Sequence, residues 1–252
     1  MSRPAALVTG GARRIGEAIV RRFAAGGWHV VIHCHTSTEH AEALAAGLPS
    51  AEIACCDLAD GAAALAMVER LAARLDDWRA LVNSASVFRP DDVAALDLAT
   101  FAEAMQVNAG TPAAMAQAYL RHARSNAGRR VIQLTDQKLA NPNPDFFSYT
   151  MSKHALGATV PMLAMAAAAE DRIYGLAPGA ILASHDQAPA EAELSHRMNL
   201  LDRRTGPEEV ADAAWFLATG PLASGEALYV DSGQHLLSQP RDVMYLARGD
   251  GA

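Results

Sequence analysis

Tyr149 and Lys153 are the two residues of this sequence whose types and spacing point most directly to proton chemistry. They stand four positions apart, so a helix would present both side chains on one face. A lysine ammonium beside a phenol favours the phenolate, and it would lower a tyrosine pKa from its usual value of about 10. The pair therefore predicts a tyrosine that hands a proton to a substrate, although Tyr149 by itself could be a half-buried structural residue.

A carboxylic acid, Asp136, stands thirteen residues before Tyr149. A ketone substrate would favour a hydroxyl at this position, because an ionised carboxylate repels the negative charge that develops on a carbonyl oxygen. Burial beside a phenol could raise the pKa of Asp136 enough for it to deliver a proton. The alternative is that Asp136 only caps the chain locally and that Thr135 supplies a hydroxyl.

A glycine-rich turn, "LVTGGARRIG", follows the first apolar run and opens a helical pattern. Glycines such as Gly10 let the backbone turn sharply and approach a ligand, and the free N–H groups of the following helix can face a pyrophosphate. Arg14 stands where many such turns carry another glycine. It could reach phosphate or a planar ligand with its forked donors, or it could be a solvated arginine of the first helical turn.

The end of the second apolar run favours NADPH over NADH. An acidic residue there would bind the ribose 2′-hydroxyl of NAD, but this sequence has His35, Thr36 and Ser37 instead. Together with Arg13 and Arg14, these residues suit a 2′-phosphate.

Short apolar runs alternate with helical patterns along the whole chain, which predicts a doubly wound parallel sheet with helices on both faces. We expect one domain over residues 1–252, with a substrate lid at about 181–204 and a C-terminal tail at about 234–252. The expected strands are 5–9, 29–34, 52–56, 80–83, 130–134, 172–176 and 227–230, and the expected helices are 15–25, 38–46, 61–75, 98–124, 148–169 and 207–218.

The composition and the start of the chain indicate a cytoplasmic protein. The net charge of −7 argues against nucleic acid or an anionic membrane as the main partner. The start of the chain does not look like a signal peptide, and no run is long enough to predict a membrane span. Cys34, Cys55 and Cys56 are expected to be reduced and buried, and we expect no metal, because His33 and His35 have no supporting ligand cluster.

Taken in order, these motifs resemble the short-chain dehydrogenase/reductase family over residues 5–235. The resemblance rests on the glycine turn, Asp57 in "CDL", "NSAS" at 83–86, Asn108, Tyr149-x-x-x-Lys153, Pro178-Gly179 and a late "VDSG". It implies that Asn108 completes a water relay, that Lys153 also holds the nicotinamide ribose, and that the protein is a homotetramer or homodimer. The implied cofactor-binding residues are Gly10, Arg13, Arg14, Ile15, His35, Thr36, Ser37, Asp57, Leu58, Ser84, Ala85, Ser86, Thr135, Tyr149, Lys153, Pro178 and Gly179.

A narrower resemblance, to pteridine reductases and dihydromonapterin reductases, rests on "TGGARRIG", "HCHTS", "NSASVF" and Asp136. It implies that Arg14 contacts phosphate and pterin, that Phe88 stacks on the pterin ring, and that Asp136 shares in proton delivery. The implied substrate-binding residues are Arg14, Ser86, Phe88, Asp136 and Tyr149. By itself, a phenylalanine such as Phe88 would more often be part of the core.

Three positions depart from this pattern. Ser84 replaces a common asparagine, and Thr36 replaces an arginine of some relatives. Pro161 is expected to interrupt the helix after Lys153 and to alter subunit packing.

The resulting functional hypothesis is an NADPH-dependent reductase of a dihydropterin of the dihydromonapterin, dihydrobiopterin or dihydrofolate type. In such a ring, hydride goes to the carbon of a C=N bond and the proton goes to nitrogen, which suits an acid at position 136. A general carbonyl reductase acting on oxoacyl thioesters or other ketones is the alternative. A non-catalytic NADPH-binding regulatory protein is the third reading, and the presence of Asn108, Tyr149 and Lys153 argues against it.

Overall fold

Seven parallel strands form one sheet at the centre of the computed structural model, which describes residues 3–184 and 187–249. The strand order is β3-β2-β1-β4-β5-β6-β7, so the chain reverses its direction of progress between β1 and β4. In such sheets, ligands bind beyond the carboxyl ends of the strands at this reversal. The strands are β1 (Ala5–Thr9), β2 (His29–Cys34), β3 (Ala51–Cys55), β4 (Trp78–Asn83), β5 (Arg130–Leu134), β6 (Arg172–Pro178) and β7 (Ala227–Val230).

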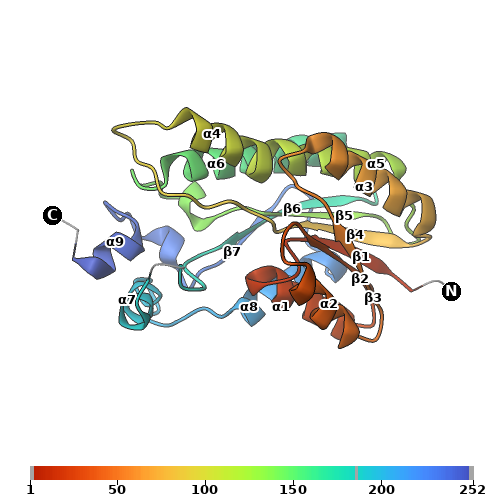
Figure 1. Cartoon of the computed structure of the whole chain (residues 1–252), viewed down its shortest axis with the longest axis horizontal. Coiled ribbons are helices and arrows are strands. Elements are labelled where there is room, and N and C mark those ends of the chain that lie inside the picture. The colour runs from red at the N-terminus through yellow and green to blue at the C-terminus, as the bar shows by residue number, and fades with distance from the viewer. Residues whose placement is uncertain (1–2, 185–186, 250–252) are drawn as a thin grey trace.

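Helices cover both faces of the sheet, as predicted. In Figure 1, α3, α4, α5 and α6 lie above the sheet and α1, α2 and α8 lie below it, while α7 and α9 stand at the end where the strands finish. The helices are α1 (Arg14–Ala25), α2 (Thr38–Ala46), α3 (Gly61–Arg74), α4 (Leu98–Met105), α5 (Thr111–His122), α6 (Phe147–Ala166), α7 (Pro189–Ser195), α8 (Pro207–Thr219) and α9 (Val243–Arg248).

Apolar side chains from the central strands face two separate clusters, one on each side of the sheet. Val8, Val30 and Ile32 pack towards α1 and α8, whereas Leu7 and Val31 pack towards α3 and α5. Successive residues of a strand point to opposite faces, and both faces are covered, which explains the nearly continuous apolar runs.

The predicted helix over 98–124 is divided by a π-helical turn, η1 (Gln106–Gly110), which contains Asn108. Single π-turns inserted between α-helical segments occur often at functional sites. The periodicity of the sequence could not reveal this turn, because one extra residue per turn changes the pattern very little.

Several other expectations need correction. Helix α6 continues past Pro161 to Ala166, so the proline does not end it. The predicted lid and tail contain regular structure, α7 in the first and α9 in the second, and only 185–186 and 250–252 of these segments lie outside the described residues. All three cysteines are free, but only Cys34 is buried as expected. Cys55 is exposed because it ends the edge strand β3, and Cys56 is half-buried.

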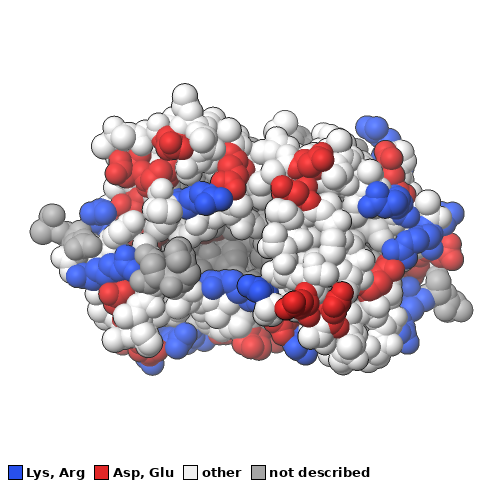
Figure 2. All heavy atoms as spheres, viewed as in Figure 1, with Lys and Arg blue, Asp and Glu red and all other residues white. Residues whose placement is uncertain are grey.

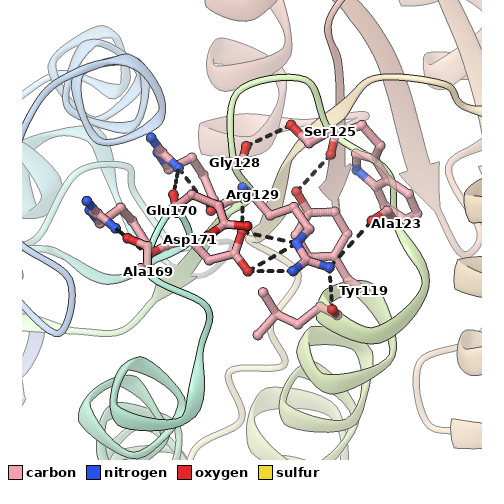
Figure 3. A network of polar contacts seen from close by, with 12 residues as sticks. Tyr119, Ala123, Ser125, Gly128, Arg129, Ala169, Glu170 and Asp171 are labelled. Atoms are coloured by element: carbon pink, nitrogen blue, oxygen red, sulfur yellow. Dashed lines mark hydrogen bonds and ion pairs between the residues drawn. The ribbon is translucent and has the colours of Figure 1, made fainter.

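A buried ion pair fixes the opposite end of the sheet, where β5 and β6 begin. The guanidinium of Arg129 donates to both carboxylate oxygens of Asp171, with its shortest contact at 2.6 Å, and it also donates to the carbonyls of Leu120 and Ala123 at the end of α5 (Figure 3). The side chain of Asp171 is only 1% exposed. This network therefore joins one helix and two strands far from the carboxyl ends of the strands.

Candidate functional site

The glycine-rich turn after β1 is held by contacts that only glycine permits. Gly10 has φ +63°, and a Cβ atom there would lie 3.0 Å from Cα of Ala85 in the segment after β4. A Cβ atom on Gly16 would lie 2.2 Å from the carbonyl oxygen of Gly10. The turn therefore lies directly against the start of α1 and leaves backbone exposed to the cleft, as a phosphate-binding turn requires.

The buried side chain of His33 supports this turn through a hydrogen bond. Its Nδ1 accepts a hydrogen bond from the Gly10 N–H over 3.1 Å, and its Nε2 lies 3.2 Å from the carbonyl of Cys56. Burial lowers the pKa of His33 to about 4. The imidazole is therefore neutral near pH 7, and its Nδ1 can accept the hydrogen bond from the backbone of the turn.

Arg14 adopts a conformation that usually belongs to glycine, with φ +57°. Its guanidinium donates to the main-chain carbonyls of Ala183 and Leu182, at 3.0 and 3.3 Å. A non-glycine residue in this region carries a strain of about 1–3 kcal/mol, and such strain often marks a ligand site. Arg14 therefore lines the cleft and joins the turn to the beginning of the predicted lid.

One end of the cleft is formed by residues at the ends of β2 and β3. His35, Ser37 and Asp57 line it, and the imidazole of His35 lies 3.9 Å from the carboxylate of Asp57. Arg13 also lines the cleft, and its guanidinium contacts Nδ1 of His40 at 2.9 Å. Thr36, by contrast, is exposed and stands outside the lining formed by the described residues.

Asn108 lies beneath the cleft floor rather than in its lining. Its amide nitrogen donates to the carbonyl of Val87 and to Oγ of Ser152, and its oxygen accepts from the Val87 N–H and from Oγ of Ser86. These four contacts tie the segment after β4 to α6. The side chain thus positions Ser86, and the expected water relay stays a prediction.

Tyr149, Asp136 and Lys153 meet at the end of β5. The Tyr149 hydroxyl donates to Oδ2 of Asp136 over 2.6 Å, and the Lys153 ammonium donates to the carbonyl of Leu134 over 2.7 Å. Oδ1 of Asp136 accepts from the Lys138 N–H, so Asp136 is both a local cap and the partner of Tyr149. The hydroxyl of Thr135 is engaged with the carbonyl of Leu176.

Burial changes the acidity of these groups. It raises the pKa of the Asp136 carboxyl, and together with the Asp136 charge it raises the pKa of Tyr149 well above 10. Burial also lowers the pKa of Lys153 to about 8. The expectation that Lys153 lowers the pKa of Tyr149 is therefore wrong for this structure, because burial and the adjacent Asp136 carboxylate both raise it. Both acids hold their protons more tightly than usual.

Phe88 stands at the entrance of this centre. Its ring stacks on Phe146 with centroids 4.0 Å apart, meets Tyr149 edge-on at 4.7 Å, and is 42% exposed. The alternative that Phe88 belongs to the core is therefore wrong. An exposed aromatic face beside a proton donor is suited to a flat ligand.

A single cleft of about 740 Å³ connects these features among the described residues. Figure 2 shows it as a hollow near the middle of one face, with basic side chains at its upper and lower rims. Nearly all the predicted site residues line it, Thr36 and Asn108 excepted. The sequence motifs did not predict several other lining residues: Arg89, Lys138, Gln187, His196, Gln234, Asp242, Val243 and Met244. Most of them lie in the predicted lid and the C-terminal tail, which carry no recognisable motif, whereas Arg89 and Lys138 lie in the segments after β4 and β5.

A family model described as "Enoyl-(Acyl carrier protein) reductase" matches residues 10–235, and the chain therefore belongs to the short-chain dehydrogenase/reductase family. The resemblance found in the sequence is thereby confirmed. A Streptomyces violaceoruber protein described as ketoacyl reductase 2 of the granaticin polyketide synthase is 32% identical, over 93% of this chain and 97% of its own.

Two further similarities are to proteins of pterin and folate reduction. A dihydromonapterin reductase of Escherichia coli is 28% identical over 91% of this chain and 96% of its own. The crystal structure of FolM alternative dihydrofolate reductase 1 from Brucella canis, complexed with NADP, superposes with a TM-score of 0.86. It is 35% identical and covers 95% of this chain and 96% of its own.

Proposed function

We propose that this protein is an NADPH-dependent reductase that transfers hydride to a C=N bond of a dihydropterin and forms the tetrahydro product. The observation that carries the proposal is the 2.6 Å hydrogen bond between Tyr149 and Asp136, in a partly buried position at the end of β5. An acid whose pKa is raised by burial suits delivery of a proton to a ring nitrogen. The similarity to a dihydromonapterin reductase and to a dihydrofolate reductase supports the same substrate class.

The residues around the cleft fit the cofactor. Gly10 leaves a cradle that a Cβ atom would fill, next to the N–H groups at the start of α1. Ser37, Arg13 and Arg14 would hold the 2′-phosphate and pyrophosphate, and Lys153 and Tyr149 would hold the nicotinamide ribose. When bound, NADPH supplies the hydride. The NADP in the Brucella canis relative supports this assignment.

The protein's own residues would orient the pterin and move the proton. Phe88 would stack on the ring, and Arg14 would bind its polar edge or the cofactor phosphate. The Tyr149 hydroxyl would donate the proton that the ring nitrogen takes up, and Asp136, which is hydrogen-bonded to that hydroxyl, would share in its delivery. Asn108 would keep Ser86 and the segment after β4 in place through its four hydrogen bonds.

A general carbonyl reductase is the second candidate, and the identity to the ketoacyl reductase relative favours it. The site argues against it, because the position expected for a hydroxyl holds a half-buried carboxylic acid, Asp136. The nearest hydroxyl in sequence, on Thr135, already donates to Leu176.

An NADPH-oxidation assay decides between the candidates. The enzyme would be mixed with NADPH and, in separate reactions, dihydromonapterin, dihydrobiopterin, dihydrofolate and a panel of oxoacyl thioesters and simple ketones. We expect oxidation with at least one dihydropterin and a kcat/KM at least tenfold lower with the carbonyl compounds. Turnover of the carbonyl compounds alone would refute the pterin assignment, and tight NADPH binding without any turnover would point to a regulatory protein.

We also propose that the protein is a cytoplasmic homo-oligomer, either a homotetramer or a homodimer. Met162 and Met165 of α6 are largely exposed on the described surface, which supports a subunit contact at this helix. Size-exclusion chromatography with light scattering measures the number of chains. No helix in the described part of the chain is long and apolar enough to cross a membrane.

A further inference from the structure

Lys138, two residues after Asp136, is a lysine with a buried charge. Its side chain is only 4% exposed, and its ammonium lies 2.7 Å from Oδ2 of Asp242. It also donates to Oδ1 of Asn143 and to the carbonyl of Asp145, each at 3.3 Å. Three acceptors therefore fix the position of this cation, which has little access to water.

The partner of Lys138 comes from the C-terminal segment, residues 241–249. Asp242 caps α9 by accepting from the Met244 N–H, and its own N–H donates to Oδ2 of Asp145. The neighbouring Arg241 pairs with Asp145 at 2.8 Å. Two adjacent ion pairs thus join this segment to the loop between β5 and α6, which also contains Asp136.

The docked segment lies directly against the proton donor. Met244 packs with Phe146 and Tyr149 in a small apolar cluster, and the ring of Tyr245 stacks on Phe146. The cleft wall includes Asp242, Val243 and Met244. The C-terminal segment therefore completes the site of its own chain.

Groups of opposite charge act on the Asp136–Tyr149 pair from the loop between β5 and α6 and from the C-terminal segment. Asp136 faces Lys138 on its own loop and Lys153 on α6, and both cations lower its pKa against the larger effect of burial. Tyr149 faces Asp136 and Asp242, and both carboxylates raise its pKa. Asp145, which also faces Lys138, is occupied by Arg241.

We propose that Lys138 and Asp242 are positioning residues of this reductase. Their ion pair docks the C-terminal segment beside Tyr149 and holds a balanced pair of charges next to the two proton-donating groups. The inference rests on the proposed function for its kinetic part and on the contacts alone for the docking part. In a site shielded from water, removing one member of the pair leaves the other charge uncompensated and close to the reacting groups.

The kinetic test compares Lys138→Met, Asp242→Asn and the double variant, with kcat/KM for a dihydropterin measured from pH 5 to 10. A general acid works only while it is protonated, so kcat/KM falls above the pKa of that acid. This fall is the alkaline limb of the pH profile. Lys138→Met removes a positive charge and should move this alkaline limb to higher pH by roughly one unit. Asp242→Asn leaves the ammonium uncompensated and should move the limb to lower pH, and the double variant should lie between the two.

Lys138→Arg, which keeps the charge, should keep the wild-type limb. Arg21→Met, which removes an exposed pair with Glu17, serves as the control and should change nothing. Shifts of both single variants in the same direction, or lower rates with an unmoved limb, would overturn the electrostatic role.

The docking test needs no pterin. Hydrogen–deuterium exchange of peptides covering 241–249 should be at least tenfold faster in Lys138→Met and Asp242→Asn than in the wild type. Unchanged exchange in both variants would overturn the docking role. If the wild-type protein reduces no dihydropterin, the proposed function fails, while the exchange measurement still decides whether this ion pair holds the segment.

Discussion

The Tyr149 hydroxyl donates a 2.6 Å hydrogen bond to the Asp136 carboxylate, and the two residues come from different elements. Asp136 follows strand β5, whereas Tyr149 lies in the first turn of α6. The loop between them carries Lys138 and Asp145, which bind the C-terminal segment. The geometry of the Tyr149–Asp136 pair thus depends on three separate parts of the chain.

Replacing either member of this pair should reduce pterin turnover more than cofactor binding. We expect Asp136→Ser and Tyr149→Phe each to lower kcat/KM by about 10²–10⁴-fold, the usual contribution of a positioned acid. The NADPH dissociation constant should change by less than about threefold for Asp136→Ser. Tyr229→Phe, in β7 outside the cleft lining, is the control, and unchanged turnover in Asp136→Ser would remove Asp136 from the proposed mechanism.

Arg13 should distinguish the two nicotinamide cofactors. Charge-assisted hydrogen bonds contribute about 1.5–3 kcal/mol, so Arg13→Ala should weaken NADPH binding by about tenfold or more and leave NADH binding unchanged. Fluorescence titration with each cofactor measures the two dissociation constants. The control is Arg21→Ala, on the exposed side of α1, and equal losses for NADPH and NADH would contradict a 2′-phosphate contact.

His33 should make the fold sensitive to mild acid. Its pKa is about 4 in the folded chain and about 6.5 when unfolded, so the unfolded state binds more protons between these values. The stability that depends on the neutral imidazole is complete above pH 6.5 and decreases by about 3 kcal/mol as the pH falls to 4. Thermal unfolding midpoints from pH 7.5 to 4.5 should fall less steeply in His33→Asn; parallel curves would contradict this role.

The Arg129–Asp171 pair should affect stability without affecting the site. Arg129→Met leaves the Asp171 carboxylate buried and unpaired, which should lower the free energy of unfolding by about 3–5 kcal/mol. Arg124→Met, which removes the exposed pair with Asp76, should cost no more than about 1 kcal/mol. Urea unfolding measures both, and kcat/KM per folded molecule should stay at the wild-type value, because the pair lies at the start of the strands.

The order of the strands and helices could be predicted from local patterns. Runs such as 5–9 and 29–34 are apolar because both faces of a central parallel strand are buried. Such strands can therefore be recognised from the sequence alone. The turn at Gly10 and the four-residue spacing of Tyr149 and Lys153 are likewise local features. They were sufficient to predict the doubly wound sheet and the line of residues along its carboxyl edge.

The parts of the site that needed the tertiary structure are contacts between distant segments. Arg14 takes a left-handed backbone conformation, and its side chain binds the carbonyls of Leu182 and Ala183, which its position in a glycine-rich turn does not show. The π-turn around Asn108 and the docking of Asp242 on Lys138 depend on packing across 44 and 104 residues of chain. The raised pKa of Tyr149 also arises only after folding, because burial and the nearby Asp136 outweigh the lysine one turn away. Sequence alone thus determined which chemical groups are present and on which elements they lie, while the fold decided which charges act on each of them.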